Sequence, residues 1–198
     1  MNIVLVGYRG VGKSTVGKLL AARLGMRYVC MDAEIVRKMS MDISEIILKF
    51  GWGKFRDLES ELTKELTWQD GIVIDTGGGV IERQENIDEL RKNTLIFWLR
   101  ASVETISSRI KDCSDRPSLT AGKTFLEEVA DVLAIREPKY QSASHYVIDT
   151  DGSDPNVEVE AMAIIWESLP LECRATVKSA EEDGRCSVKK NDNILEPD

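Results

Sequence analysis

The sequence predicts an α/β fold in which a parallel β-sheet is covered on both faces by helices. Short apolar runs, typical of buried strands, alternate along the chain with longer segments whose apolar residues recur every three or four positions. The first apolar run is followed directly by a glycine-rich loop and then by a helical pattern. This order of strand, loop and helix is typical of parallel α/β domains that bind phosphate groups.

The composition is that of one ordinary globular domain, with 198 residues, 30% of them charged and 42% hydrophobic. The formal net charge of −8 argues against a general binder of nucleic acid or of anionic membranes. No apolar run approaches the roughly 18 residues of a membrane span, and the first residues lack a signal-peptide layout. We therefore expect a cytoplasmic protein and, as the simplest case, a monomer.

The cysteines and the histidine show no chemical pattern. Cys30, Cys113, Cys173 and Cys186 form no C-x-x-C pair, so we expect reduced thiols rather than disulfides or a zinc site. The single histidine, His145, precedes an apolar strand, and we interpret it as an ordinary, partly exposed residue rather than a catalytic base.

The strongest motif follows the apolar strand at residues 3–6. Gly7, Gly12, Lys13 and Ser14 fit the pattern G-x-x-x-x-G-K-S/T, and a helical pattern comes next. Glycines let backbone amides approach phosphate oxygens, and the start of the helix adds partial positive charge. The lysine can reach terminal phosphates, and the serine hydroxyl can bind Mg²⁺. The motif therefore predicts a nucleotide-phosphate site rather than a plain structural turn.

The remaining elements alternate. We expect strands at 27–31, 72–74, 95–99 and 146–148, and helices at about 35–39, 43–50, 55–66, 84–91, 102–110, 125–136 and 155–168. The polar segment 111–124 is interpreted as a lid. Residues 1–170 are predicted to form a single domain, and the aperiodic residues 171–198 a flexible C-terminal tail.

Acidic residues and glycines gather where the carboxyl ends of these strands should meet. Asp32 follows the second strand, and Asp75 ends the third strand just before Gly77, Gly78 and Gly79. Ligands of open parallel sheets bind at this edge, and an aspartate beside a phosphate loop commonly holds Mg²⁺ or its waters. Three successive glycines indicate a backbone that a ligand approaches closely. For Asp32, the role of a helix N-cap stays open beside that of a ligand.

Three arginines could complete such a site. Arg56 lies at the start of a predicted helix, Arg116 in the polar segment and Arg136 at a predicted helix end. Guanidinium groups suit carboxylates and phosphates, so together these residues would fit an anionic substrate and a transferring phosphoryl group. Considered singly, each of them is more typical of a surface residue than of a ligand contact.

Over residues 1 to about 168 the chain resembles the shikimate kinases. The matching features are G-Y-R-G-V-G-K-S-T at 7–15, F-R-D-L-E at 55–59, T-G-G-G at 76–79, D-R-P at 115–117 and R-E-P-K-Y at 136–140. The resemblance implies a fold like that of nucleoside monophosphate kinases, with five parallel strands in the order 2-3-1-4-5. It also implies Mg²⁺-dependent phosphoryl transfer from ATP to the 3-hydroxyl of shikimate.

The resemblance also implies roles for individual residues. Asp32 would orient the attacking hydroxyl, and Arg116 would reach the phosphates from the lid. Shikimate would be bound by Asp32 with Arg56, Arg136 and the glycines at 77–79, and residues 33–60 would form the substrate-binding segment. The ATP phosphates would be held by Gly10, Val11, Gly12, Lys13, Ser14, Thr15 and Arg116, with Ser14 on Mg²⁺.

One departure from the family pattern leaves alternatives open. Many members carry D-x-D at the end of strand two, whereas this chain has Cys30-Met31-Asp32, and a neutral thiol is a poor ligand for Mg²⁺. Asp75 stands where the family often has a small residue, and we hypothesise that it takes over the missing aspartate's duty toward Mg²⁺. A gluconate-type kinase of the same fold remains an alternative, as does a non-catalytic nucleotide-binding member, for which Cys30 is the best support.

Overall fold

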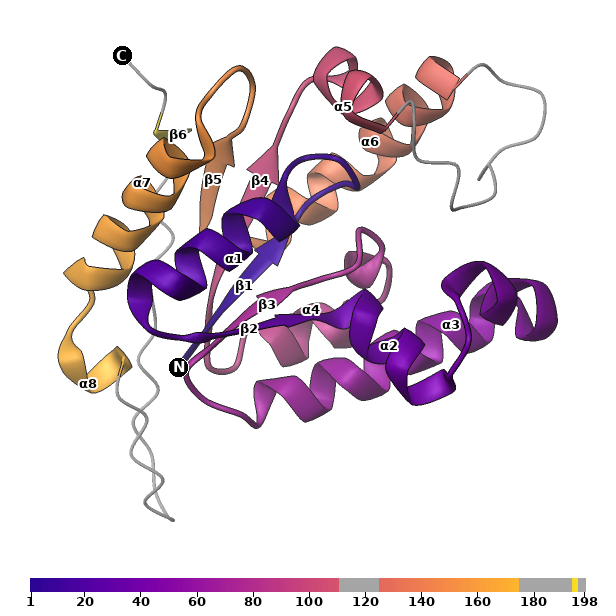
Figure 1. Cartoon of the computed structure of the whole chain (residues 1–198), viewed down its shortest axis with the longest axis horizontal. Helices are drawn as coiled ribbons and strands as arrows, with labels where there is room; N and C mark the ends of the chain where they lie inside the picture. The colour runs from indigo at the N-terminus through magenta and orange to yellow at the C-terminus, as the bar shows by residue number, and fades with distance from the viewer. Residues whose placement is uncertain (111–124, 175–193, 196–198) are drawn as a thin grey trace.

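The computed structural model describes residues 1–110, 125–174 and 194–195, and in it a parallel sheet lies between two layers of helices (Figure 1). The sheet has the order β2-β3-β1-β4-β5-β6, and all of its paired strands are parallel. The first five strands confirm the predicted order 2-3-1-4-5. They are β1 (Asn2–Val6), β2 (Arg27–Cys30), β3 (Ile72–Asp75), β4 (Thr94–Arg100) and β5 (Tyr146–Asp149).

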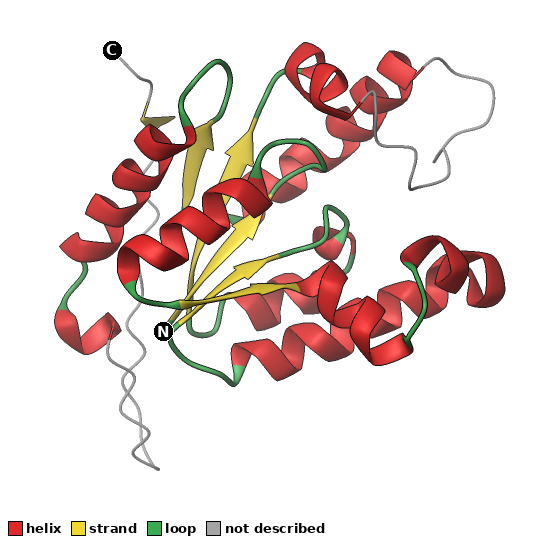
Figure 2. Ribbon diagram, in the orientation of Figure 1, coloured by secondary structure: helices red, strands yellow, loops and turns green. Residues whose placement is uncertain are grey.

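Helices cover both faces of the sheet, as Figure 2 shows in red around the yellow strands. On one face α1 packs beside α7, and on the other α3 packs against α2 and α4 (Figure 1). A short 3₁₀ helix, η1 (Val80–Glu82), follows the triple glycine. The helices are α1 (Lys13–Leu24), α2 (Met31–Met39), α3 (Ile43–Thr67), α4 (Gln84–Leu90), α5 (Val103–Ile110), α6 (Phe125–Ala143) and α7 (Pro155–Ser168).

Local sequence explains where several helices begin and end. Gly25 ends α1 with a φ of 65°, a conformation that glycine adopts without strain. Asp42 and Glu45 form a capping box at the start of α3. Asp154 accepts a hydrogen bond from the amide of Asn156 at the start of α7. The bounds of α7 agree with the sequence prediction because both a capping aspartate and an N-terminal proline mark its start.

Two sequence predictions about helix bounds were wrong, at α2 and α6, and one was confirmed, at α3. Helix α2 begins at Met31 with Cys30 as its N-cap, so Asp32 lies in the first turn and is not the cap. The two helices predicted at 43–50 and 55–66 are confirmed, because the backbone of α3 breaks between them at Gly51 (φ 80°, ψ 167°). Helix α6 was predicted to end at residue 136, but it continues through Pro138 to Ala143, because burial of Tyr140 and Ala143 in the core stabilises the last turns. Arg136 therefore lies within a helix and not at its end.

Each face of the sheet has its own hydrophobic core, because successive side chains of a strand point to opposite faces. In β1, Ile3 and Leu5 belong to the core under α1 and α7, whereas Val4 and Val6 belong to the core under α2, α3 and α4. Helix α6 contributes to both cores, with Val129 and Leu133 in the first and Tyr140 and Ala143 in the second. It therefore passes from one face to the other and carries Arg136 in between.

Two short elements lie in the segment predicted to be a flexible tail, namely α8 (Leu171–Arg174) and β6 (Ile194–Leu195), which pairs with β5. The rest of that segment lies outside the described residues. Cys173 in α8 is disulfide-bonded, so the expectation of a reduced thiol is wrong for this residue. Sequence spacing could not show this, because a disulfide depends on which residues the fold brings within reach. Of the cysteines that the structure describes, Cys30 is free.

In the described part of the chain, no helix is both long and apolar enough to cross a bilayer. The cytoplasmic location and the monomeric state stay predictions.

Candidate functional site

A cavity of about 1020 Å³ opens at the carboxyl ends of the central strands. Its walls come from the loop after β1, from the ends of β2, β3 and β5, and from α5, α6 and α7. The structure thus brings together residues that the sequence placed at separate strand ends. The sequence-predicted residues in the lining are Gly10, Val11, Gly12, Lys13, Ser14, Thr15, Asp32, Asp75 and Gly78.

The loop after β1 has a shape that its own backbone and lysine maintain. Gly10 and Gly12 adopt φ values of 84° and 99°, which residues other than glycine rarely adopt. The buried Lys13 ammonium donates hydrogen bonds to the carbonyl oxygens of Gly7 and Tyr8, each at 3.0 Å. The lysine therefore lies over the loop with its charge held close to the cavity.

Asp75 lies at the centre of a second polar cluster, beside the start of α1. Its Oδ2 atom accepts hydrogen bonds from Ser14 Oγ at 2.6 Å and from Tyr28 Oη at 2.7 Å, and the residue is only 3% exposed. Burial raises the pKa of Tyr28, and the negative charge of Asp75 raises it further, so the phenol stays a neutral donor.

Cys30 and Asp75 are partners in the register of β2 and β3, and both line the cavity. Burial raises the pKa of the Cys30 thiol, which keeps it neutral. In the part of the chain that the structure describes, no cluster of three or more His, Cys, Asp and Glu side chains could hold a metal ion. The donors beside the loop are thus one hydroxyl and one carboxylate, a set that suits Mg²⁺ when substrate phosphates complete its coordination.

Asp32 and Arg56, two of the predicted substrate-binding residues, lie close to the triple glycine together with Glu59. A Cβ atom at Gly77 would lie 2.6 Å from Glu59 Oε1 and 3.0 Å from Asp32 Oδ1, and one at Gly79 would collide with the Arg56 guanidinium. None of the glycines at 77–79 has a positive φ. These positions therefore lack side chains because Asp32, Arg56 and Glu59 approach the backbone closely.

Gly78 connects the triple glycine to the phosphate loop and to α6. A Cβ atom there would lie 3.4 Å from both the Arg9 nitrogen and the Gly7 oxygen. Its carbonyl oxygen accepts a hydrogen bond from the hydroxyl of Tyr140, which is fully buried. Burial raises the pKa of Tyr140, so this hydroxyl stays protonated and keeps the contact.

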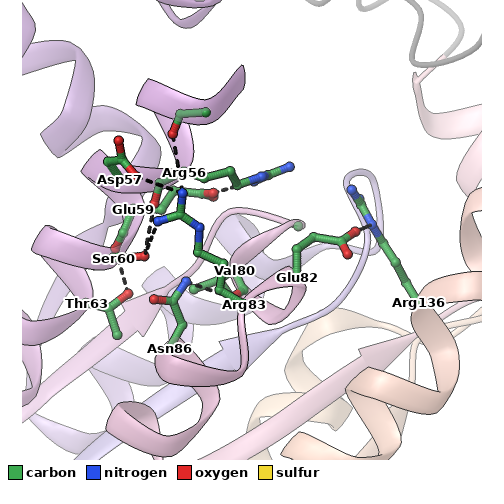
Figure 3. A network of polar contacts seen from close by, with 12 residues as sticks. Arg56, Asp57, Glu59, Ser60, Thr63, Val80, Glu82, Arg83, Asn86 and Arg136 are labelled. Atoms are coloured by element: carbon green, nitrogen blue, oxygen red, sulfur yellow. Dashed lines mark hydrogen bonds and ion pairs between the residues drawn. The ribbon is translucent and has the colours of Figure 1, made fainter. Parts of the chain in front are cut away.

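Both predicted substrate arginines in the described residues pair with a carboxylate of the protein. Arg56 pairs with Glu59 on the same helix, and its guanidinium lies 5.3 Å from the Trp52 ring centroid. Arg136 donates from Nε to Glu82 Oε1 at 2.6 Å. In Figure 3 the side chains of Arg56 and Arg136, from α3 and α6, point toward the same region. Neither of them is among the described residues that line the cavity by the phosphate loop.

Glu82 and Arg83, which sequence reasoning missed, hold this region together (Figure 3). Glu82 Oε2 also accepts a hydrogen bond from Lys139 at 2.6 Å. Burial alone would raise the pKa of Glu82, but the hydrogen bonds from Lys139 and Arg136 outweigh it and hold the pKa below its usual range. Arg83 bonds to Asp57 at 2.7 Å and thereby ties the end of η1 to α3. No motif marks either residue, since both are charged side chains just outside the triple glycine.

Sequence reasoning also missed the residues that form the opposite wall of the cavity. Arg109 donates to the Thr150 carbonyl at 2.8 Å, and Thr150 Oγ1 donates to the Val11 carbonyl at 3.0 Å. Ser153 and Pro155 line the cavity nearby. One signal could have found this wall, because residues 150–155 directly follow the predicted fifth strand and must therefore lie at the same sheet edge.

His145 was interpreted as an ordinary residue, and it is not among the described residues that line the cavity. His145 lies at the start of β5, where its Nδ1 accepts a hydrogen bond from the Ile96 amide at 2.9 Å. Arg116 and the predicted lid at 111–124 lie outside the described residues.

Comparison with known proteins gives matches along most of the chain. A family model described as shikimate kinase matches residues 9–168. The shikimate kinase of Thermodesulfovibrio yellowstonii is 42% identical over 168 residues, which are 85% of this chain and 96% of the relative. Shikimate kinase 2 of Syntrophotalea carbinolica is 37% identical over 167 residues, covering 83% of this chain and 96% of that protein.

Solved structures give the same result. A shikimate kinase from Acinetobacter baumannii in complex with shikimate superposes with a TM-score of 0.80 at 33% identity, covering 85% of this chain and 95% of that chain. A gluconokinase from Sinorhizobium meliloti 1021 reaches a TM-score of 0.51 at 16% identity, covering 85% and 97% of the two chains. The second match is a likeness of fold alone.

Proposed function

This chain belongs to the shikimate kinase family, and we propose that it transfers the terminal phosphoryl group of ATP to the 3-hydroxyl of shikimate. One observation carries the proposal. The triple glycine after β3 is approached by Asp32, Arg56 and Glu59 on one side and by the backbone of the phosphate loop on the other. An acceptor held at these side chains would therefore lie beside the phosphates of a nucleotide held at the loop.

The nucleotide half of the site relies on the loop and the residues that follow it. Residues 10–15 offer backbone amides to the phosphates, and the N-terminus of α1 adds its partial positive charge. Lys13 stands ready to neutralise charge that spreads over the transferring group. The cavity extends toward Arg109 and Pro155, which leaves room there for the base of the nucleotide.

The acceptor half relies on charged side chains. Arg56 and Arg136 suit the carboxylate of shikimate, because a guanidinium binds a carboxylate through two parallel hydrogen bonds. Asp32, next to Gly77, would hold the attacking hydroxyl and orient its proton. The backbone of Gly77, Gly78 and Gly79 supplies further contacts to the acceptor. For a loose transition state, such positioning and charge stabilisation provide most of the catalysis.

The donor set beside the loop fits Mg²⁺. Ser14 would contribute its hydroxyl, and Asp75 would hold the metal through the serine or through a bound water. When bound, the ion neutralises charge on the phosphate oxygens. In this arrangement the neutral Cys30 thiol would not be a ligand of the metal, either directly or through a water. This removes the main reason to expect a non-catalytic protein.

Two segments complete the proposal. Residues 33–60, which comprise α2 and the first part of α3, would form the acceptor-binding segment. The lid would be residues 111–124, from which Arg116 reaches the phosphates. Residues 1–170 would then be one kinase domain.

The test is ADP release at fixed Mg²⁺-ATP with shikimate, gluconate or a nucleoside monophosphate as the acceptor. Turnover with shikimate alone is the expected result. At shikimate concentrations below the KM, Arg56→Ala should abolish most of this turnover while ATP still binds. Arg27→Ala, which removes an exposed arginine at the amino end of β2, serves as the control. Turnover with gluconate would replace the substrate, and silence with all three acceptors would contradict the proposal.

A further inference from the structure

Tyr28 contacts the phosphate side of the site through its hydroxyl group. Its hydroxyl donates to Asp75 Oδ2, the same oxygen that accepts the hydrogen bond of Ser14. Tyr28 is not among the described residues that line the cavity, whereas Ser14 and Asp75 are. The tyrosine therefore acts on a bound nucleotide indirectly, through Asp75 and the neighbouring Ser14.

The sheet register explains why a carboxylate at this place needs such support. Position 30 is the β2 partner of Asp75, and it carries a neutral thiol that offers no hydrogen bond strong enough to orient a carboxylate. Asp75 is thus the acidic group at this strand end, and both hydroxyl donors bind one of its two oxygens. Two hydrogen bonds to Oδ2 fix the rotation of the carboxylate and leave Oδ1 for a metal-bound water.

The ring of Tyr28 is held independently of its hydroxyl. A Cβ atom at Gly17 of α1 would lie only 2.9 Å from Tyr28 Cε2, which shows how closely the ring packs on the helix. The Lys18 ammonium lies 5.8 Å from the ring centroid. Removal of the hydroxyl therefore leaves the packing of the ring in place and isolates the hydrogen bond to Asp75.

We propose that Tyr28 is a positioning residue for the magnesium–nucleotide complex. Its hydroxyl holds Asp75 in the rotamer that receives the Ser14 proton, so that the lone pairs of the serine oxygen face the cavity. Partners of this kind, one bond removed from the metal, typically change metal affinity by about 10- to 100-fold when they are lost. The inference rests on the proposed function only in assuming that Ser14 and Asp75 serve Mg²⁺.

The experiment measures the affinity of the full chain for ADP by isothermal titration calorimetry, once with excess MgCl₂ and once with EDTA. The ratio of the two dissociation constants reports how much Mg²⁺ strengthens binding, and no acceptor is present. Tyr28→Phe should lower this ratio about tenfold and leave the affinity in EDTA unchanged. Tyr146→Phe, on β5 with its ring against Phe97, is the matched control and should change neither value.

A double-mutant cycle tests whether the tyrosine acts through the carboxylate. In an Asp75→Asn background, Tyr28→Phe should have no further effect on the ratio, because the two residues form one unit. Cys30→Asp in that background, which puts a carboxylate at the partner position, should raise the ratio again and make it independent of Tyr28.

The outcomes separate this inference from the proposed function. An unchanged ratio in Tyr28→Phe would overturn the inference and leave the metal role of Ser14 and Asp75 standing. An equal loss of affinity in MgCl₂ and in EDTA would mean a merely structural role and would overturn it as well. A ratio of one in the unmodified chain would overturn both the metal part of the proposed function and the inference.

Discussion

The two halves of the proposed site, one for the nucleotide phosphates and one for the acceptor, are fixed in different ways. On the phosphate side, Lys13 is held by two backbone carbonyls and Ser14 by an aspartate that is part of the sheet. On the acceptor side, Arg56 and Arg136 are held by the carboxylates of Glu59 and Glu82. The first half depends on backbone geometry, and the second depends on ion pairs between side chains.

This difference teaches how each half responds to its ligand. A phosphate meets amides and a lysine that are already in position, so little ordering is required when it binds. A substrate carboxylate meets arginines that already have a negative partner. It must bind beside Glu59 and Glu82, and the remaining guanidinium nitrogens decide the affinity. Changes on the phosphate side should therefore affect the chemical step, and changes on the acceptor side should affect substrate binding.

The largest effect is expected for Lys13→Met, which keeps the aliphatic length and removes the charge. Loss of one preorganised donor to the transferring group typically lowers kcat by about 10²- to 10³-fold. The KM for shikimate should stay within about threefold, since the acceptor side is untouched. Steady-state kinetics measures both values, and Lys64→Met on the exposed face of α3 is the control. A large rise in the shikimate KM would contradict the division of the site into two halves.

The opposite pattern is expected for Arg136→Ala. Loss of a charged hydrogen-bond pair costs about 1.5–3 kcal/mol, which corresponds to a rise in the shikimate KM of about 10- to 100-fold. Arg136→Lys should recover little of this, because an ammonium cannot reproduce the planar fork. ADP affinity, measured by calorimetry, should stay the same. If the affinity for ADP fell as much as the affinity for shikimate, the arginine would belong to the nucleotide half.

The sequence predicted that the residues of the proposed phosphate half would lie together, because they are contiguous. Lys13 and Ser14 follow one another at a strand-to-helix junction, so local geometry alone brings them to the cavity. The parallel sheet was equally predictable from alternating apolar runs. Asp75 was predicted at the right strand end, but its hydrogen bond to Tyr28 depends on the register of β2 and β3, which no local pattern encodes.

The acceptor half was harder to predict because it combines side chains from distant elements. Glu82, the partner of Arg136, lies 54 residues away in the sequence, on η1. The close approach of Arg56 to Gly79 depends on the packing of α3. Helix α6 was predicted to stop before Pro138, since the tertiary packing that stabilises its last turns is invisible to propensity. The sequence motifs identified the arginines, but their ion pairs with Glu59 and Glu82 become visible only in the fold.

A smaller effect is expected for Gly79→Ala. The backbone at this position has a φ of −108° and a ψ of 6°, which alanine tolerates. The new methyl group would collide with the Arg56 guanidinium, whose flexible end must move away. We expect the KM for shikimate to rise about tenfold with a stable fold, because one charged contact is displaced rather than removed.

The matched control is Gly53→Ala, at a position where a Cβ atom would meet nothing within 4 Å. Steady-state kinetics and thermal denaturation of both variants separate crowding of Arg56 from a general effect of replacing glycine. An unchanged KM in Gly79→Ala would show that Arg56 does not need its present place to bind the acceptor.

The smallest effect is expected for Glu82→Gln, which weakens the hold on Arg136 and Lys139 without removing either cation. The shikimate KM should change by no more than about threefold, and the ion pair, whose carboxylate is still partly exposed, contributes less than about 1 kcal/mol to stability. Because the pKa of Glu82 lies below its usual value in the folded chain, its pairing stabilises the fold above about pH 4.5 and this stabilisation is lost as the pH falls through the folded-state pKa. The melting temperatures of the two proteins should therefore differ most near pH 7 and converge toward pH 3.

Glu104→Gln, in the exposed first turn of α5, controls for the loss of a carboxylate elsewhere. A difference that stayed constant across this range would show that the carboxylate of Glu82 positions the arginine without contributing charge, and the acceptor half would then be held by shape rather than by ion pairs.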